Sequence, residues 1–301
     1  MPERPLLKPW YRLSVDGGRS TLRYAGSVLE FEGEAAERLL PHLLPLLDGT
    51  RSVDQVVAEL GEPARPAVEH ALALLRAHDL LTEPALSDRE RRCAELLAAT
   101  DGFGRTVAEL AARIAAVEVF VLGAAPTAEL VGRLLQWSGA RSVESVGWDD
   151  PVPAEFVVAA PASGELPLLE DWNRRALAAG AAWMQVLPFD GRLAAVGPVF
   201  VPGQTACHAC FLHRRDATIA PIRDRTSGGH AGSPALDAVV AGLAAHVAIR
   251  RLAADDVSSA GVLVGVEAHE LRCTRHFVHR VPRCPACSRV SAAVPWSAVA
   301  A

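Results

Sequence analysis

Two cysteine pairs constrain this chain more than any other feature of its 301 residues. Cys207 and Cys210 lie in "QTACHACFLHR", and Cys284 and Cys287 lie in "RCPACS" near the end of the sequence. Two Cys-x-x-Cys turns offer four thiolates, the number that fills a closed tetrahedral zinc site. A metal held in this way would join two distant segments, so metal binding would contribute directly to folding.

Two other interpretations of these thiols exist. A redox dithiol needs only one pair at the start of a helix, and disulfides are rare in the cytoplasm, where we expect this chain. The second pair therefore favours structural zinc with no coordination position left for water. Histidines that could compete as ligands are His208, His213, His276 and His279. The remaining cysteines, Cys93 and Cys273, are expected to be ordinary buried or half-buried thiols.

Composition and charge argue against several classes of protein. Half of the residues are hydrophobic, and the length favours two domains with full cores. The formal net charge is -5 and the isoelectric point is about 6.1, which argues against a general nucleic-acid binder; Lys8 is the only lysine, so arginine carries nearly all of the positive charge. No signal peptide is visible, and no window approaches the roughly 20 apolar residues of a membrane span. We therefore expect a cytoplasmic protein without a membrane partner.

Residues 1–84 predict a small β3α3 domain with a winged-helix-like shape. Turn residues at 16–18 and 25–26 separate three short strands. Helical spacing of apolar residues then predicts helices over Glu34–Leu47, Ser52–Leu60 and Pro66–His78, the second with a serine cap. Such a domain can bind DNA or a peptide.

Charge disfavours DNA as the ligand of this domain. Nine basic residues stand against twelve acidic ones through Thr82, and the third helix offers only Arg76 to a major groove. A strand at a sheet edge, beside a partly apolar helix, can instead receive an extended peptide as an added strand.

The stretches "SVLEFEGEAAERLLPHLLPLLDGTRSVDQVVAEL" and "ALALLRAHDLL" resemble the PqqD-like recognition elements of ribosomally synthesised and post-translationally modified peptides (RiPPs). In that family the leader sequence of a precursor peptide pairs with the third strand and packs on the third helix. The resemblance implies peptide-binding residues at Val28, Leu29, Glu30 and Phe31 of the strand, and at Val68, Ala71, Leu72 and Leu75 of the helix. The apolar residues of the helix, and one face of the strand, could equally belong to the core.

Residues 85–301 predict an α/β domain with a parallel sheet. "VEVFVLG", at residues 117–123, is typical of a buried parallel strand, and strands alternate with helices after it. The following loop reads "VLGAAPTAELVG", in which only Gly123 remains of a glycine-rich phosphate loop. Since Pro126 has no amide donor and alanine side chains crowd a phosphate, we expect no tight nucleotide binding. Asp149 and Asp150 could contact a ribose, but a polar turn is preferred.

The motifs "AAVGPVFVPGQTACHACFLHRR" and "HRVPRCPACS" resemble the ThiF-like, E1-superfamily proteins of azole-peptide biosynthesis. Those proteins have a Rossmann-type α/β fold, are often fused to a recognition element, and deliver a precursor peptide to a YcaO-type cyclodehydratase. The resemblance implies a structural Zn²⁺ ion on the four paired cysteines. It also implies that the region of the long helix from Ala235 could pair two subunits, which allows a homodimer.

The predicted function is that of a non-catalytic adaptor. It would bind the leader peptide and activate a YcaO-type cyclodehydratase for thiazoline or oxazoline formation, in biosynthesis of the bacteriocin or thiopeptide type. ATP would be used by the partner enzyme and not by this chain. The alternative is an active E1-like enzyme that adenylates a peptide, and a zinc-containing transcription factor is disfavoured by charge.

Overall fold

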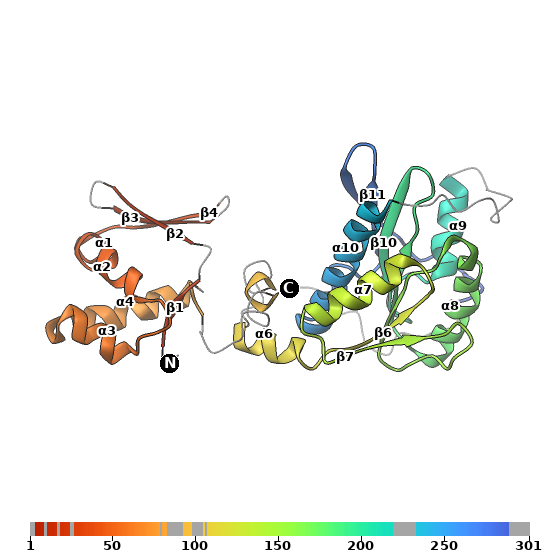
Figure 1. Cartoon of the computed structure of the whole chain (residues 1–301). Coiled ribbons are helices and arrows are strands. Elements are labelled where there is room, and N and C mark those ends of the chain that lie inside the picture. The colour runs from red at the N-terminus through yellow and green to blue at the C-terminus, as the bar shows by residue number, and fades with distance from the viewer. Residues whose placement is uncertain are drawn as a thin grey trace. The chain divides into compact units, whose positions relative to one another are not determined.

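The chain folds into two compact units, Met1–Ala112 and Arg113–Ala301 (Figure 1). The computed structural model describes residues 4–8, 11–16, 19–24, 27–78, 80–82, 93–97, 105, 107–218 and 233–288. The predicted domain boundary between residues 84 and 85 lies outside these ranges and stays a prediction.

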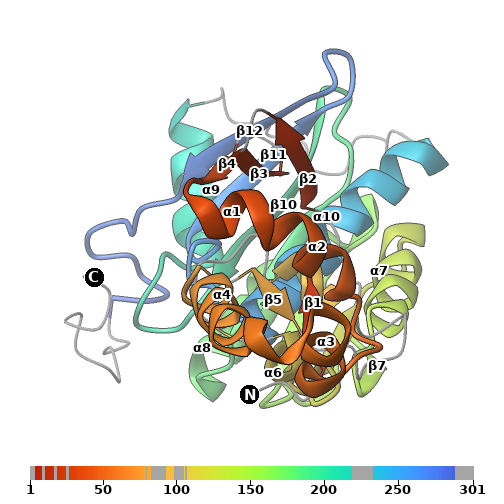
Figure 2. The same cartoon turned by 90° about the vertical axis from the view of Figure 1, so that its left-hand side faces the viewer.

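A three-stranded antiparallel sheet forms one layer of the first unit. Its strands β2 (Arg12–Asp16), β3 (Arg19–Tyr24) and β4 (Ser27–Phe31) pair in the order β2-β3-β4, as the turn residues predict. A separate pair joins β1 (Leu6–Leu7) to β5 (Leu81–Thr82), which the sequence patterns do not predict. In Figure 2 the three-stranded sheet lies above the helices of this unit.

The helix predicted over residues 34–47 is broken into three short pieces. These are α1 (Glu34–Arg38), α2 (Leu40–Leu43) and the 3-10 helix η1 (Leu44–Leu46), and a proline stands in the first turn of each of the last two. Because proline lacks an amide proton and its ring blocks the preceding turn, one continuous helix cannot form. The leucines along the segment still enter the core, as their spacing predicts.

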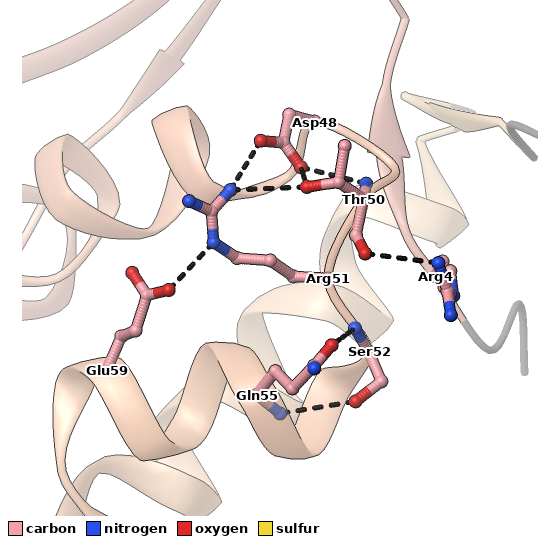
Figure 3. A network of polar contacts seen from close by, with 7 residues as sticks. All are labelled: Arg4, Asp48, Thr50, Arg51, Ser52, Gln55 and Glu59. Atoms are coloured by element: carbon pink, nitrogen blue, oxygen red, sulfur yellow. Dashed lines mark hydrogen bonds and ion pairs between the residues drawn. The ribbon is translucent and has the colours of Figure 1, made fainter.

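The predicted serine cap is confirmed at the start of α3 (Val53–Leu60). The Ser52 hydroxyl accepts a hydrogen bond from the Gln55 amide at 3.2 Å, and the Gln55 side chain accepts one from the Ser52 amide at 2.8 Å (Figure 3). This capping box satisfies two amides that have no partner within the helix. A 3-10 turn, η2 (Glu62–Ala64), then leads into α4 (Arg65–Ala77).

One hydrophobic core joins the sheet and helices of the first unit. Leu22 of β3 is fully buried among leucines and valines of α2, α3 and α4. On the same strand, the buried Ser20 hydroxyl donates a hydrogen bond to the Ala36 carbonyl of α1 at 2.7 Å. The unit therefore has the predicted β3α3 arrangement, with the sheet fixed to its helices by packing and by this bond.

A seven-stranded mixed sheet lies at the centre of the second unit, in the order β12-β11-β10-β9-β8-β6-β7. The parallel part is β6 (Glu118–Leu122), β7 (Ser142–Val146), β8 (Phe156–Ala159) and β9 (Trp183–Leu187). The antiparallel part is β10 (Leu193–Phe200), β11 (Val262–Glu267) and β12 (Arg272–Phe277). The predicted α/β class is confirmed, although only half of the sheet is parallel.

Helices cover both faces of this sheet. α7 (Pro126–Trp137) and α10 (Pro234–Ala253) pack together on one face, and α8 (Leu168–Ala179) and α9 (His208–Thr218) lie on the other (Figure 1). The interior strand β8 is consequently buried along its whole length. α6 (Val107–Ile114) precedes β6, and the 3-10 turn η3 (Ser163–Glu165) precedes α8. None of the helices in the described ranges is long and apolar enough to cross a membrane.

Candidate functional site

The four paired cysteines meet at one point of the second unit. Cys207 and Cys210 lie at the start of α9, while Cys284 and Cys287 lie in the turns that follow β12. The Cys207 sulfur is 3.8 Å from the sulfurs of Cys210 and Cys284, and 3.6 Å separates the sulfurs of Cys210 and Cys287. All four lie within 4.8 Å of one another. Sulfurs bound to one tetrahedral zinc at about 2.3 Å are themselves about 3.8 Å apart, so the cluster fits a single ion.

The geometry argues against the two other interpretations of these thiols. A disulfide would bring two sulfurs to about 2.05 Å, and all four cysteines are free. All four are also buried, with no more than 2% of any residue exposed. A redox dithiol must be reached by a partner thiol, and burial withdraws both pairs from such contact.

Hydrogen bonds among the thiols control their protonation. The bond from the Cys207 thiol lowers the pKa of Cys210, and the Val281 amide, 3.3 Å from that sulfur, adds to the effect. The same bond, together with burial, raises the pKa of Cys207. Burial also raises the pKa of Cys287 to about 11. A metal ion would displace the remaining protons, so its affinity should rise with pH.

Two arginines hold the cysteine turns in place, and sequence reasoning missed both of them. Arg280 donates hydrogen bonds to the carbonyls of Gly203 at 3.1 Å and Cys287 at 2.9 Å, so it joins the two turns. Arg214 of α9 donates in turn to the Arg280 carbonyl at 3.0 Å. The only signal in the sequence is the arginine-rich stretch "HRVPRC", which does not indicate which arginine turns inward.

The candidate histidines lie outside the thiol cluster. His208 is buried, with Nδ1 2.8 Å from the Gln185 side-chain oxygen and its amide donating to the Asn173 side chain at 3.0 Å. The other three, His213, His276 and His279, are exposed. Cys93 is half-buried as predicted, but Cys273 is exposed on β12, which corrects the expectation for that thiol. β12 is an edge strand, because among the described strands it pairs with β11 alone.

The geometry of the loop after β6 explains why Gly123 is needed there. Gly123 has a φ of 117°, and a Cβ at this position would lie 2.2 Å from the Ala160 carbonyl oxygen. Glycine is therefore required by the close approach of two strand ends. The next amide, that of Ala124, donates to the Glu165 carboxylate at 3.0 Å. Asp150 accepts a hydrogen bond from the Gly147 amide at 2.7 Å, so it forms a polar turn, the preferred interpretation of this aspartate.

The residues predicted to bind a peptide lie on β4 and α4 of the first unit. Among the described strands β4 pairs with β3 alone, so its other edge carries no described strand. Val28 is 51% exposed and Glu30 is exposed, whereas Leu29 and Phe31 pack against the core. The four α4 residues lie in the core and are 0–8% exposed: Val68, Ala71, Leu72 and Leu75. Their side chains hold α4 in place, and direct contact with a peptide stays a prediction.

Known structures share this fold. No protein-family model and no curated protein sequence matches the chain. The structure of a heterocyclase in complex with substrate and cofactor matches with a TM-score of 0.72 and 21% identity, covering 94% of this chain and 39% of that chain. The heterocyclase TruD matches with a TM-score of 0.69 and 21% identity, over 95% and 43% of the two chains. E. coli MccB with ATP matches with a TM-score of 0.67 and 16% identity, over 94% and 99%.

These matches confirm the predicted fold, which this chain shares with the heterocyclases and with MccB. The chain spans about two fifths of the length of the heterocyclases and nearly the whole length of MccB. At such low identity the likeness concerns the fold, and the site must be argued from its own residues. The PqqD-like assignment of the first 84 residues stays a prediction.

Proposed function

We propose that this protein is a leader-peptide-binding adaptor that presents a RiPP precursor to a YcaO-type cyclodehydratase and activates that enzyme. The β4 edge that carries no described strand supports the proposal, because its backbone groups can accept an extended peptide as a fourth strand. Similar folds are known for a heterocyclase in complex with its substrate and for MccB in complex with N-formylated MccA, which supports a peptide as the ligand. The domain of residues 1–84 would act as the recognition element.

Two surfaces of β4 would have different roles in peptide recognition. Its backbone edge would supply affinity for many sequences, while the exposed Val28 and Glu30 side chains would contribute selectivity. Leu29, Phe31 and the core residues of α4 would set the position of the strand. Tethering the leader would keep the core peptide near the enzyme and so raise its effective concentration.

The second unit would serve as a metal-stabilised scaffold. Four buried thiols at tetrahedral spacing suit Zn²⁺, and they leave no position at which the ion could bind water. Zinc would stabilise the fold by joining α9 to the turns after β12. A homodimer formed through α10 is compatible with this role.

The alternative function is ATP-dependent adenylation of a peptide. A structure of the similar MccB contains ATP, which favours it. Against it, the loop after β6 has one glycine, and the Ala124 amide already serves the Glu165 carboxylate. The second unit also has no lysine to contact phosphates. We therefore assign ATP consumption to the partner enzyme.

A leader-binding assay tests the proposal. The full chain should bind a fluorescent synthetic leader peptide of a precursor encoded near its gene, without ATP, and should form azolines only with a YcaO-type enzyme. Val28→Arg should weaken binding about tenfold or more, because a bulky charge would stand beside the added strand.

Val15→Arg is the matched control. Val15 lies on β2, the opposite edge of the same sheet, and is 49% exposed against 51% for Val28. Equal weakening by both substitutions would contradict the β4 edge as the site. Peptide-dependent exchange of pyrophosphate into ATP by the chain alone would favour the adenylating alternative.

A further inference from the structure

The side chain of Glu165 occupies a position that this class of fold normally leaves to a ligand. β6 lies between β7 and β8, and the helices that follow β6 and β8 cover opposite faces of the sheet. The connections therefore diverge at the carboxyl ends of β6 and β8. In doubly wound α/β folds, ligands bind at this switch point.

Three donors from three strand ends converge on the Glu165 carboxylate. One oxygen accepts hydrogen bonds from the amides of Ala124, after β6, and Ala162, after β8, at 3.0 and 2.8 Å. The other oxygen accepts one from the indole nitrogen of Trp148, after β7, at 2.8 Å. Two backbone amides and an indole group can donate hydrogen bonds through their N–H groups but cannot accept them there. Together they form an environment suited to an anion.

The surroundings hold Trp148 in this arrangement. Its ring lies edge-on to that of Trp172, with 6.4 Å between the ring centroids. Arg175 of α8 donates to the Trp148 carbonyl, and at 2.8 Å to the carbonyl of Asp150. The indole donor is therefore positioned by contacts that do not involve Glu165.

We propose that Glu165 is a built-in occupant of the switch point: its carboxylate takes the place of an anionic ligand and locks the ends of β6, β7 and β8 together. This inference goes beyond the proposed function and does not depend on leader binding. It explains how, in a fold shared with an ATP-bound protein, the ends of these three strands can stay joined without a nucleotide. It also implies that removal of the carboxylate exposes a site for small carboxylates.

Partial burial acts to raise the pKa of Glu165, but its three hydrogen bonds hold that pKa below the usual value. The carboxylate is thus charged at neutral pH, as an internal anion must be. An uncharged side chain at position 165 should therefore fail to replace the carboxylate.

Chemical rescue tests the lock in the full chain. Glu165→Ala should lower the melting temperature by several degrees and open a space beside the three donors. Formate or acetate should then restore much of the loss, whereas chloride at equal ionic strength should not. The wild type and Glu129→Ala, which removes an exposed carboxylate from α7, should respond to formate no more than to chloride.

Glu165→Gln keeps the shape and covers the case in which the alanine variant does not fold. Amide exchange at Ala124 and Ala162 should be about tenfold faster than in the wild type, because a neutral acceptor replaces a charged one.

Four results would each overturn the inference. The first two are a Glu165→Ala variant that melts like the wild type, and rescue by formate no greater than that by chloride. The other two are unchanged amide exchange in Glu165→Gln and tight binding of ATP by the wild type. Failure of the chain to bind a leader peptide would contradict only the proposed function.

Discussion

At the scale of single residues, the candidate metal site depends on side chains other than the four cysteines. The cysteines supply the sulfurs, but Arg280 brings the two turns together by bonding to carbonyls at residues 203 and 287. Arg214 supports Arg280 through its carbonyl. Such supporting contacts orient ligands and are therefore part of the site.

Replacing Arg280 should loosen the site while leaving every ligand in place. Arg280→Ala should cost about 1–2 kcal/mol of unfolding free energy, because two carbonyls lose their charged donor. Release of zinc to a colorimetric chelator should become faster.

Arg283→Ala is the control, since Arg283 is exposed and belongs to the same turn. If both variants released metal at the same rate, the role assigned to Arg280 would be incorrect.

At the scale of elements, the loop before α3 is stabilised by a set of short-range polar contacts. Thr50 donates to the Asp48 carboxylate through its hydroxyl at 2.6 Å and its amide at 2.9 Å. Arg51 joins that carboxylate to Glu59 of α3, with 2.8 Å between its Nε and the glutamate (Figure 3). These contacts connect the end of η1 to the helix that follows.

The contacts in this loop should lower the pH at which Asp48 titrates. The hydroxyl and amide of Thr50 lower its pKa to about 2, with a further contribution from Arg51. Because the folded pKa lies below the unfolded one, the stabilisation is present above about pH 4 and is lost as pH falls towards 2. Carbon-detected NMR of the full chain should locate this midpoint.

Thr50→Ala should move the midpoint of Asp48 upward, since it removes the hydroxyl that lowers the pKa most. Ser52→Ala breaks the neighbouring cap and should leave the midpoint unchanged. An unshifted midpoint in Thr50→Ala would show that the hydroxyl does not stabilise the carboxylate.

At the scale of the whole molecule, only the second unit should depend on metal. Cys207 and Cys284 are 77 residues apart in the sequence, so one bound ion would close a long loop and restrict the unfolded chain strongly. The first unit has a separate hydrophobic core and, within the described residues, no such cluster. The two units should therefore unfold in separate transitions, and only that of the second unit should depend on metal.

Removing the metal should affect one of two thermal transitions. Scanning calorimetry of the zinc-loaded chain should show one transition whose midpoint temperature falls by about ten degrees or more after chelation. The reason is that the free energy of metal binding contributes to the free energy of folding in such sites. Cys210→Ser should have the same effect. The exposed Cys273→Ser should have none, and a chelator-insensitive melting profile would contradict a structural metal.

Much of this protein can be predicted from local patterns. Cys-x-x-Cys spacing, the Ser52 cap and the apolar run of β6 each express a preference of a few neighbouring residues. The loss of glycines after β6 is equally local. These features are enough to indicate the two cysteine turns, the β3α3 unit and the α/β class, because each depends on residues that are close together in the chain.

The tertiary structure alone decided which polar groups meet. Glu165 reaches an amide 41 residues earlier, and Arg280 reaches a carbonyl 77 residues earlier. The antiparallel half of the sheet and the burial of the α4 positions likewise depend on packing between distant segments. Local spacing restricts the conformation of a turn or a helix, but a hydrogen bond between distant residues exists only after the whole chain has brought their atoms together.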